Sequence, residues 1–449
     1  MTKVSVVGGG LAGCEIALQL AHAGVAVELH EMKPAKRTPA QVSDTFAELV
    51  CSNSFRSSNP ENAVGLLKEE LRAAGSFVIA AADASKVPAG DALAVDREQF
   101  SRRLHEQVHT HANIRIVLGE VTAVPEGGLT VLATGPLTGE ALAEDLRRVI
   151  GATQLYFYDA IAPIIAADSI DHGIVFAQSR YDKGETPDYL NCPLDDAEYH
   201  AFVAALVAAQ KVDFKTFEKP TYFEGCLPIE VMAERGAETL SFGPMKPVGL
   251  TDPRTGRQPY GVIQLRKENV AGTAYNLVGF QTKLIQSEQR RIFRSIPGLA
   301  AAEFLRYGAV HRNTYVEAPK VLLQGMELKA RAGVYLAGQM VGVEGYLEST
   351  AHGFLVAKAL LARLSDRAFV LPPATTALGA LLHHVIGDSA STVKHYGPEN
   401  VHWGMVPPLE GKVKKLNKKA MLVERARAAY ADWLPTASPH GQRGLVPMA

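Results

Sequence analysis

The chain has 449 residues, of which 47% are hydrophobic and 21% charged, and this ordinary balance excludes extended disorder. Its length predicts two or three domains. The formal net charge is −1, so no global field attracts nucleic acid, and a nucleic-acid partner requires a local basic patch.

The cysteine content and the hydropathy pattern bear on location and on metal binding. The four cysteines form no CxxC pair and no zinc spacing with histidines, so we expect neither a disulfide scaffold nor a metal site. No signal-peptide pattern and no apolar stretch of about 20 residues is present, so no membrane span is expected. The sequence therefore predicts a cytoplasmic protein with free thiols.

The first thirty residues predict a strand–turn–helix–strand unit. Residues 3–7 form a short apolar strand, residues 8–13 a glycine turn, residues 11–23 a helix and residues 25–29 a second strand. The turn satisfies GxGxxG in the structural context that dinucleotide binding requires, because the glycines allow a tight turn and close approach of a pyrophosphate to the helix N-terminus. The cofactor-binding residues predicted here are Gly8, Gly9, Gly10, Leu11, Ala12 and Gly13.

An acidic residue is expected at the end of the second strand, where it accepts hydrogen bonds from ribose hydroxyls. Glu31 lies eighteen residues after Gly13 and fits this place, whereas Glu28 points elsewhere by strand alternation. The alternative is a glycine turn without ligand and a solvated Glu31. An acidic residue here argues against a 2′-phosphate on the ribose.

Residues 34–63 are rich in Ser, Asn, Pro and Thr and predict a long functional loop with a short helix at 44–50. Beyond it we expect helices, then a meander of short strands, then a further helix. The expected helices cover 65–74, 96–109 and 139–150, and the expected strands cover 114–118, 120–124 and 129–132.

The middle of the chain, about 155–320, is less regular and predicts an inserted domain with a helix at 195–209. A segment around 333–353 then returns to the strand, glycine turn and helix order of the first residues. The expected fold is α/β, a Rossmann-type FAD-binding domain with an inserted smaller α+β domain. Its expected limits are 1–190 for the first part of the FAD-binding domain, 191–320 for the substrate or tRNA insert and 321–449 for the closing part with a basic helix.

Two further features favour FAD over NAD as the dinucleotide. "TGP" at 134–136 ends a strand in a small-residue turn, and "VYLAGQ", which contains Gly338 and Gln339, resembles the segment that closes the flavin site in many FAD enzymes. A second GxGxxG for a nicotinamide nucleotide is absent from the sequence, which disfavours an architecture with two nucleotide domains.

Two cysteines lie in turn-rich, polar segments, where a purely structural cysteine is less common. They are Cys51 in "LVCSNSFRSSN" and Cys226 in "YFEGCLPIE", and each is either a chemically active or an inert thiol. Arg56 and nearby Ser and Asn side chains favour a thiolate or an anion there. Cys14 is expected in the core of the first helix, and Cys192 carries no specific prediction.

Nearly the whole chain resembles the folate-dependent tRNA uracil-5-methyltransferases (TrmFO), relatives of the wobble-uridine-modifying GidA/MnmG flavoproteins. The most specific segments are those with the cysteines; the glycine turn and the "AGQ" segment are shared more widely. The resemblance rests on "VVGGGLAGCEIALQLA", "ELHEMKP", "ELVCSNSFRS", "YFEGCLPIEVMAERG", "LSFGPMKPVGL", "NLVGFQTKL" and "YLAGQMVGVEGYLESTAHG".

This resemblance implies a reaction. Methylenetetrahydrofolate gives its one-carbon unit to reduced FAD, which passes it to carbon 5 of the T-loop uridine (position 54) of tRNA, with electrons from NADPH or NADH. Carbon 5 becomes nucleophilic once a thiolate adds to carbon 6, and a base then removes the carbon 5 proton. The matching segments imply Cys226 as the nucleophile, Cys51 as the base or its partner, and Tyr346 beside the flavin or folate; plain core packing is the alternative for Tyr346.

A tRNA substrate requires phosphate contacts, and the best local candidate is the basic segment "GKVKKLNKKA" with the helix after it. The alternative is a solvated charged helix. The residues concerned are Lys412, Lys414, Lys415, Lys418, Lys419, Arg425 and Arg427, with Lys246, Arg254 and Arg257 as further candidates.

Three other functions stay open: a wobble-uridine-modifying flavoprotein, a generic NAD(P)H:flavin oxidoreductase, and a non-catalytic flavin-dependent RNA-binding protein. The wobble enzymes have longer chains and are not expected to carry this cysteine pair. Flavin colour in the purified protein and a steep salt dependence of tRNA binding discriminate among them. The sequence leaves open the oligomeric state, the preferred nicotinamide, the folate pocket and the tRNA docking surface.

Overall fold

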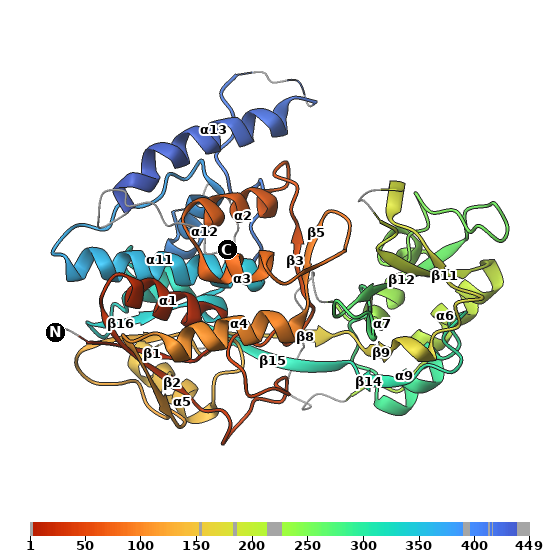
Figure 1. The fold of residues 1–449 in the computed structure, drawn as a ribbon, viewed down its shortest axis with the longest axis horizontal. Coiled ribbons are helices and arrows are strands. Elements are labelled where there is room, and N and C mark those ends of the chain that lie inside the picture. Colours follow the sequence, from red (N-terminus) through yellow and green to blue (C-terminus); the bar gives the residue numbers. More distant parts are fainter. Residues whose placement is uncertain are drawn as a thin grey trace.

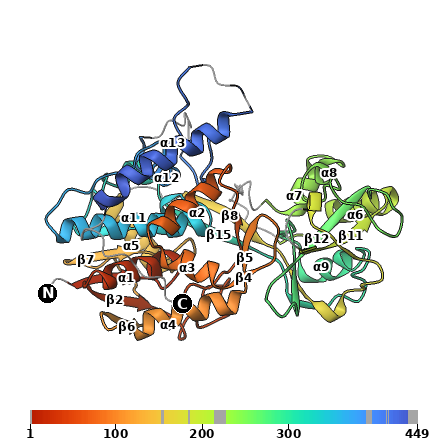
Figure 2. The same cartoon turned by 45° about the horizontal axis from the view of Figure 1, so that its top comes forward.

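The computed structural model describes residues 3–151, 155–182, 186–212, 227–388, 396–411, 414 and 416–437. The chain forms two lobes, and Figures 1 and 2 show the larger lobe built from both ends of the chain and the smaller one from its middle. A two-stranded antiparallel ribbon, β8 (Leu155–Ile161) and β15 (Ala309–Tyr315), runs between them.

The larger lobe is organised around a five-stranded parallel sheet in the order β16-β7-β1-β2-β6. Both faces of β1 carry buried residues, because Val4 and Val6 on one face are fully buried and Val7 on the other is 4% exposed, as expected for a central parallel strand. The strands are β1 (Lys3–Val7), β2 (Ala26–Glu31), β6 (Ile114–Leu118), β7 (Leu129–Leu132) and β16 (Val334–Leu336).

The expected meander is wrong. Strands β6 and β7 follow each other in sequence, but β6 pairs with β2 and β7 pairs with β1, both parallel, and residues 120–124 form no strand. Parallel neighbours are joined by long crossovers, such as the helix between β1 and β2, so local alternation of apolar residues does not reveal the partner strand.

Helices α1 (Leu11–His22) and α11 (Tyr346–Leu364) are in close contact beside this sheet. The approach depends on Gly353, because a Cβ at that position would lie 2.8 Å from the carbonyl oxygen of Ala12. The other helices of the larger lobe are α2 (Ala63–Ala73), α3 (Phe77–Asp83), α4 (Arg97–Thr110), α5 (Glu140–Ile150), α10 (Ala318–Val321), α12 (Ala377–Ile386) and α13 (Lys418–Trp433). A small antiparallel sheet joins β3 (Ser54–Ser57), β5 (Ala92–Val95) and β4 (Lys86–Val87).

The smaller lobe has its own hydrophobic core under a six-stranded antiparallel sheet, in the order β10-β11-β12-β13-β9-β14. Its strands are β9 (Ile164–Ala166), β10 (Phe176–Ala177), β11 (Tyr189–Leu194), β12 (Gly261–Lys267), β13 (Ala274–Leu277) and β14 (Phe304–Arg306). Its helices are α6 (Asp196–Ala208), α7 (Ile229–Glu234), α8 (Thr239–Phe242) and α9 (Gln286–Phe293).

The parallel sheet with an inserted α+β lobe agrees with the expected fold class. The sheet of the smaller lobe includes β9 and β10, which precede residue 191, as well as strands that follow it. The domain limits at 190 and 320 stay a prediction. In the part of the chain that the structure describes, no helix is long and apolar enough to cross a membrane, and no group of three His, Cys, Asp or Glu side chains is arranged to hold a metal ion.

Candidate functional site

The glycine turn between β1 and α1 is shaped by contacts that only glycine tolerates. Gly8 has a φ of +104°, and a Cβ there would lie 2.6 Å from the carbonyl oxygen of Ala133. A Cβ on Gly13 would lie 1.8 Å from the carbonyl oxygen of Gly8, so α1 sits directly against the turn. At Gly10, by contrast, no atom of the described residues comes within 4 Å of the Cβ position.

Open space at Gly10, beside the N-terminus of α1, fits the phosphates of a dinucleotide. The first turn of α1 contains no acidic residue, so its free N–H groups and positive dipole end are available to an anion. The neighbouring thiol of Cys14 is fully buried, and burial raises its pKa, in agreement with a packing role on the first helix.

Glu31 closes the other side of the turn. It ends β2 and is 5% exposed; its Oε2 accepts from the N–H of Gly9 at 2.9 Å, and its Oε1 accepts from the N–H of Lys33 at 2.9 Å. Glu28 instead forms an ion pair with Lys3, and this interaction lowers the pKa of its carboxyl group. Glu31 is therefore the carboxylate at the turn.

A cavity, here named the dinucleotide cavity, runs from this turn to α11. It brings together every sequence-predicted cofactor residue except Gly13, which lies behind the turn. Its wall includes Gly8, Gly9, Gly10, Leu11, Ala12, Glu31, Thr134, Gly135, Pro136, Gly338, Gln339 and Tyr346. Sequence reasoning missed Thr38, Gln41 and Glu48, which line the same cavity.

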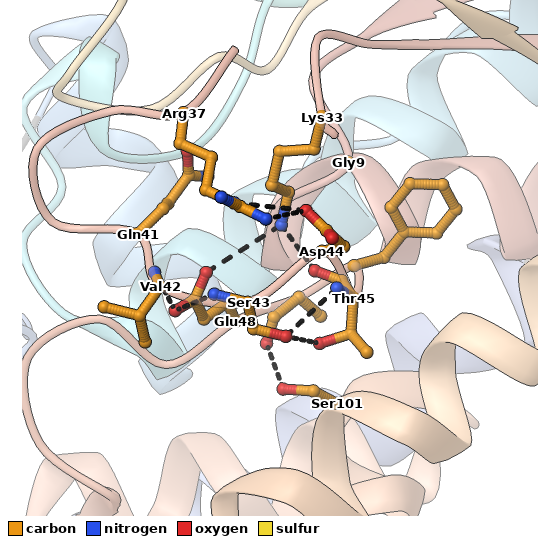
Figure 3. Close-up of polar contacts among 12 residues, drawn as sticks. Gly9, Lys33, Arg37, Gln41, Val42, Ser43, Asp44, Thr45, Glu48 and Ser101 are labelled. Carbon is orange, nitrogen blue, oxygen red and sulfur yellow. Dashed lines mark hydrogen bonds and ion pairs between the residues drawn. The ribbon is translucent and has the colours of Figure 1, made fainter. Parts of the chain in front are cut away.

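These three residues belong to the loop of residues 33–48, whose polar contacts are drawn in Figure 3. The side chain of Lys33 is 2% exposed, donates to the carbonyl oxygen of Thr45 and lies 3.9 Å from a carboxylate oxygen of Glu48. Glu48 also accepts from the N–H groups of Val42 and Ser43 at 2.8 and 3.2 Å. The N–H of Ala47 donates to the carbonyl oxygen of Gly9 at 2.8 Å, which fastens the loop to the glycine turn.

The helix expected at 44–50 is wrong, and the same contacts explain why. Ser43 and Thr45 hydrogen-bond to each other through their side chains, and Glu48 reaches back to N–H groups that precede the segment. Such side-chain bonds compete with a helical backbone, and Ala47 has a φ of 51°, which no α-helix contains.

A second cavity, the inter-lobe cavity, lies between the two lobes and has a volume of about 330 Å³. Gln339 and Tyr346 line both cavities, so the two are neighbours. Its wall includes Cys51, Ser52, Ser54, Arg56, Arg266, Asn276, His311, Asn313, Glu344, Tyr346 and Asn400.

Cys51 is held at the junction of the two cavities through its backbone. Its N–H donates to the hydroxyl oxygen of Tyr346 at 2.6 Å, and its carbonyl oxygen accepts from Nη2 of Arg97 at 3.0 Å. Arg97 also donates to the carbonyl oxygen of Leu49 and forms an ion pair with Glu268, which is 5% exposed. Burial raises the pKa of Tyr346, so its hydroxyl is protonated at neutral pH.

Arg56 lies on the wall of the same cavity. Its guanidinium forms an ion pair with Glu348, a fully buried residue of α11 whose Oε1 also accepts from the N–H of Val401 at 3.0 Å. Arg56 has a φ of 65°, an uncommon conformation for a residue with a side chain. The C-terminal segment around Val401 therefore helps to hold the arginine that the sequence singled out.

The structure describes only some of the other candidate residues from the sequence. Cys226, Lys412 and Lys415 lie outside the described residues. Cys192 is buried in the smaller lobe, and burial raises the pKa of its thiol.

The basic helix α13 presents less positive charge to a nucleic acid than expected, because both of its arginines bind other groups of the protein. Arg425 donates to the carbonyl oxygens of Pro407 and Pro408, and Arg427 forms a two-bond ion pair with Glu69 at 2.6 and 2.7 Å. Arg254 is likewise paired with Asp252. The exposed residues that remain are Lys246, Arg257, Lys414, Lys418 and Lys419.

Comparison with known proteins gives consistent matches. The family model described as "Glucose inhibited division protein A" matches residues 3–368. A relative from Anaeromyxobacter dehalogenans (strain 2CP-C) is 59% identical over 441 residues, 98% of each chain. A relative from Myxococcus xanthus (strain DK1622) is 57% identical over 97% of this chain and 95% of its own. Both carry the name methylenetetrahydrofolate--tRNA-(uracil-5-)-methyltransferase TrmFO.

Among solved structures, GidA from Aquifex aeolicus superimposes with a TM-score of 0.67 at 16% sequence identity. The match covers 95% of this chain and 76% of the GidA chain, and at this identity it supports the fold alone.

Proposed function

The chain belongs to the glucose inhibited division protein A family and to its folate-dependent tRNA uracil-5-methyltransferase branch, and on this premise we propose that it methylates carbon 5 of a uridine in tRNA. The one-carbon donor is methylenetetrahydrofolate, the uridine is that of the T-loop (position 54), and the protein works in the cytoplasm. The observation that carries the proposal is 59% identity over 98% of both chains to a relative of that name.

The names of the relatives support this activity over wobble-uridine modification. The relatives from Myxococcus xanthus and Geobacter sulfurreducens are each 57% identical to this chain, and both carry the name methylenetetrahydrofolate--tRNA-(uracil-5-)-methyltransferase TrmFO. The described thiol Cys51 on the inter-lobe cavity supports it over a non-catalytic RNA-binding protein, because a binding module needs no cysteine beside its dinucleotide cavity.

The reaction needs a reductant because a methylene group is two electrons more oxidised than a methyl group. Bound FAD, reduced by NADPH or NADH, would supply these electrons and would carry the one-carbon unit. The residues proposed to hold it are the turn from Gly8 to Gly13, with Glu31 for the ribose hydroxyls and Gly338, Gln339 and Tyr346 at the flavin end. The open Cβ position of Gly10 and the buried carboxylate of Glu31 support this assignment.

Two cysteines are proposed for the chemistry at uracil. Cys226 adds to carbon 6 as a thiolate, which makes carbon 5 nucleophilic, and Cys51 takes the carbon 5 proton directly or through a partner. The support for Cys51 is its place on the cavity wall, with its backbone fixed by Tyr346 and Arg97. For Cys226 the support is the sequence resemblance.

The test is transfer of labelled carbon from methylenetetrahydrofolate to unmodified tRNA, with FAD and NADPH present. The variants are Cys226→Ala and Cys51→Ala, and Cys192→Ala is the matched control because that thiol is buried in the smaller lobe. We expect wild type and control to label tRNA, and both other variants to bind FAD but transfer no label. If wild type oxidises NADPH without labelling tRNA, the proposed function is wrong.

A further inference from the structure

Residues 49–53, here named the cysteine segment, are held through an arginine that also binds the other lobe. Arg97, on α4 of the larger lobe, donates to the carbonyl oxygen of Leu49 and, from Nη2, to that of Cys51 at 3.0 Å. The same guanidinium forms an ion pair with Glu268, which directly follows β12 of the smaller lobe. Because a guanidinium presents its donors in a planar, fixed fork, it holds these groups in one geometry.

The smaller lobe also contacts the far end of the cysteine segment. Asn53 is fully buried; its Oδ1 accepts from Nε of Arg266 at 3.0 Å, and its Nδ2 donates to the carbonyl oxygen of Lys267 at 2.8 Å. Three consecutive residues of the smaller lobe, 266–268, therefore hold the segment on both sides of Cys51.

The ion pair is buried but lies outside the cavities. The side chains of Arg97 and Glu268 are 17% and 5% exposed, and neither residue is among the described residues that line the dinucleotide or the inter-lobe cavity. A buried ion pair adds little net stability over apolar side chains of similar volume, because both charges lose their hydration. Its geometry, rather than its contribution to stability, is what an apolar pair could not replace.

The position of the segment matters because of what it carries. Cys51 lines the inter-lobe cavity, and its N–H donates to the hydroxyl oxygen of Tyr346 at 2.6 Å. Tyr346 lines both cavities, so a shift of the segment moves the thiol and breaks a contact at the junction of the two.

We propose that Glu268, acting through Arg97, is a positioning residue for Cys51: the smaller lobe holds the cysteine segment so that the thiol stays within reach of the uracil ring. This inference rests on the proposed function, in which Cys51 takes the carbon 5 proton directly or through a partner. Neither Glu268 nor Arg97 touches the substrate or exchanges a proton. Displacing a reacting group by about 1 Å can cost about 100-fold in rate, so loss of this positioning should appear in kcat.

The experiment uses the FAD-loaded full chain and separates stability from catalysis. The double variant Arg97→Ala/Glu268→Leu removes both charges, so no buried carboxylate is left unpaired, and Arg97→Lys keeps a charge opposite Glu268 without the guanidinium fork. The control is Arg72→Ala/Asp83→Ala, which removes an ion pair between α2 and α3 with bonds of 2.7 and 2.8 Å. Neither control residue is among the described residues that line the two cavities.

Four quantities are measured for each protein. They are the melting temperature, the rate of flavin reduction by NADPH, and kcat and KM for transfer of labelled carbon from methylenetetrahydrofolate to unmodified tRNA. We expect the double variant to melt near wild type, to reduce its flavin within about twofold of the wild-type rate, and to lose about 100-fold in kcat at a KM within about threefold. Arg97→Lys should lose about 10-fold in kcat, and the control should match wild type.

A kcat within about threefold of wild type in the double variant would overturn the inference, because the pair would then be structural only. A raised KM at unchanged kcat, or flavin reduction slowed as much as label transfer, would overturn it as well. If the double variant does not fold, Arg97→Lys decides by the same comparison. In each case wild type still labels tRNA, whereas failure of the proposed function means that wild type itself transfers no label.

Discussion

Two single-methyl substitutions in the glycine turn separate the binding of a dinucleotide from the packing of the fold. Gly10→Ala adds a methyl group where no atom of the described residues lies within 4 Å, and Gly13→Ala adds one 1.8 Å from the carbonyl oxygen of Gly8. The first substitution enters space that we assign to the pyrophosphate. The second enters occupied protein.

The expected magnitudes follow from these positions. Gly10 has a φ of −77°, which alanine adopts, so the lost chain entropy of the unfolded state contributes about 0.4–1 kcal/mol. Alanine is a poorer N-cap than glycine, which offsets this gain, so the free energy of unfolding without cofactor stays within about 1 kcal/mol of wild type. For Gly13→Ala the helix must move away from the turn, and overpacking of this kind costs about 1–3 kcal/mol or more.

The assays are urea unfolding of the FAD-free protein and titration of FAD by its fluorescence. We expect Gly10→Ala to unfold like wild type but to bind FAD at least about 10-fold more weakly, because a methyl group displaces the phosphates. Gly13→Ala is expected to lose both stability and affinity. Wild-type FAD affinity in Gly10→Ala would refute the assignment of this turn to the pyrophosphate.

Three further predictions follow from other contacts. Arg97→Ala leaves Glu268 buried without its partner and should lower the free energy of unfolding by about 3–5 kcal/mol in urea titrations. The double variant with Glu268→Leu should recover most of the lost stability. Equal losses in the single and the double variant would contradict this reasoning. Burial raises the pKa of Glu70 to about 8, so its neutral carboxyl group contributes fully to the free energy of unfolding below the unfolded pKa near 4.5. This contribution is lost as pH rises towards 8. Calorimetry should find the resulting fall in stability in wild type and not in Glu70→Gln. Lys418→Ala should reduce the salt dependence of tRNA binding by about one phosphate contact, while Arg427→Ala, whose guanidinium is paired with Glu69, should leave it unchanged.

The residues at the glycine-turn end of the dinucleotide cavity could be selected from the sequence, because the signal that marks them is local. The glycine turn and Glu31 lie within one strand–helix–strand unit, and each residue type follows from the space and hydrogen bonds available there. Gly338 and Gln339 were found through their likeness to a known closing segment. The structure brings these residues together in the dinucleotide cavity.

The rest of the site depends on contacts between distant segments, which local patterns do not encode. Arg97 and Glu268, which fix the loop of Cys51, are 171 residues apart in sequence. Asn276 and His311 lie in a region that the sequence marked only as an insert. The absent meander has the same origin, because its strands pair across crossover connections. The absent helix at 44–50 has a local cause, because side-chain hydrogen bonds within the loop compete with a helical backbone.

Carbon transfer from folate to uridine in tRNA can be followed by mapping the modified nucleotide. Unmodified tRNA is incubated with the FAD-loaded enzyme, NADPH and methylenetetrahydrofolate carrying carbon-13 in its methylene group, then digested and read by mass spectrometry. We expect labelled 5-methyluridine in the T-loop alone. Label at the wobble position, or NADPH oxidation without labelled nucleoside, would contradict it.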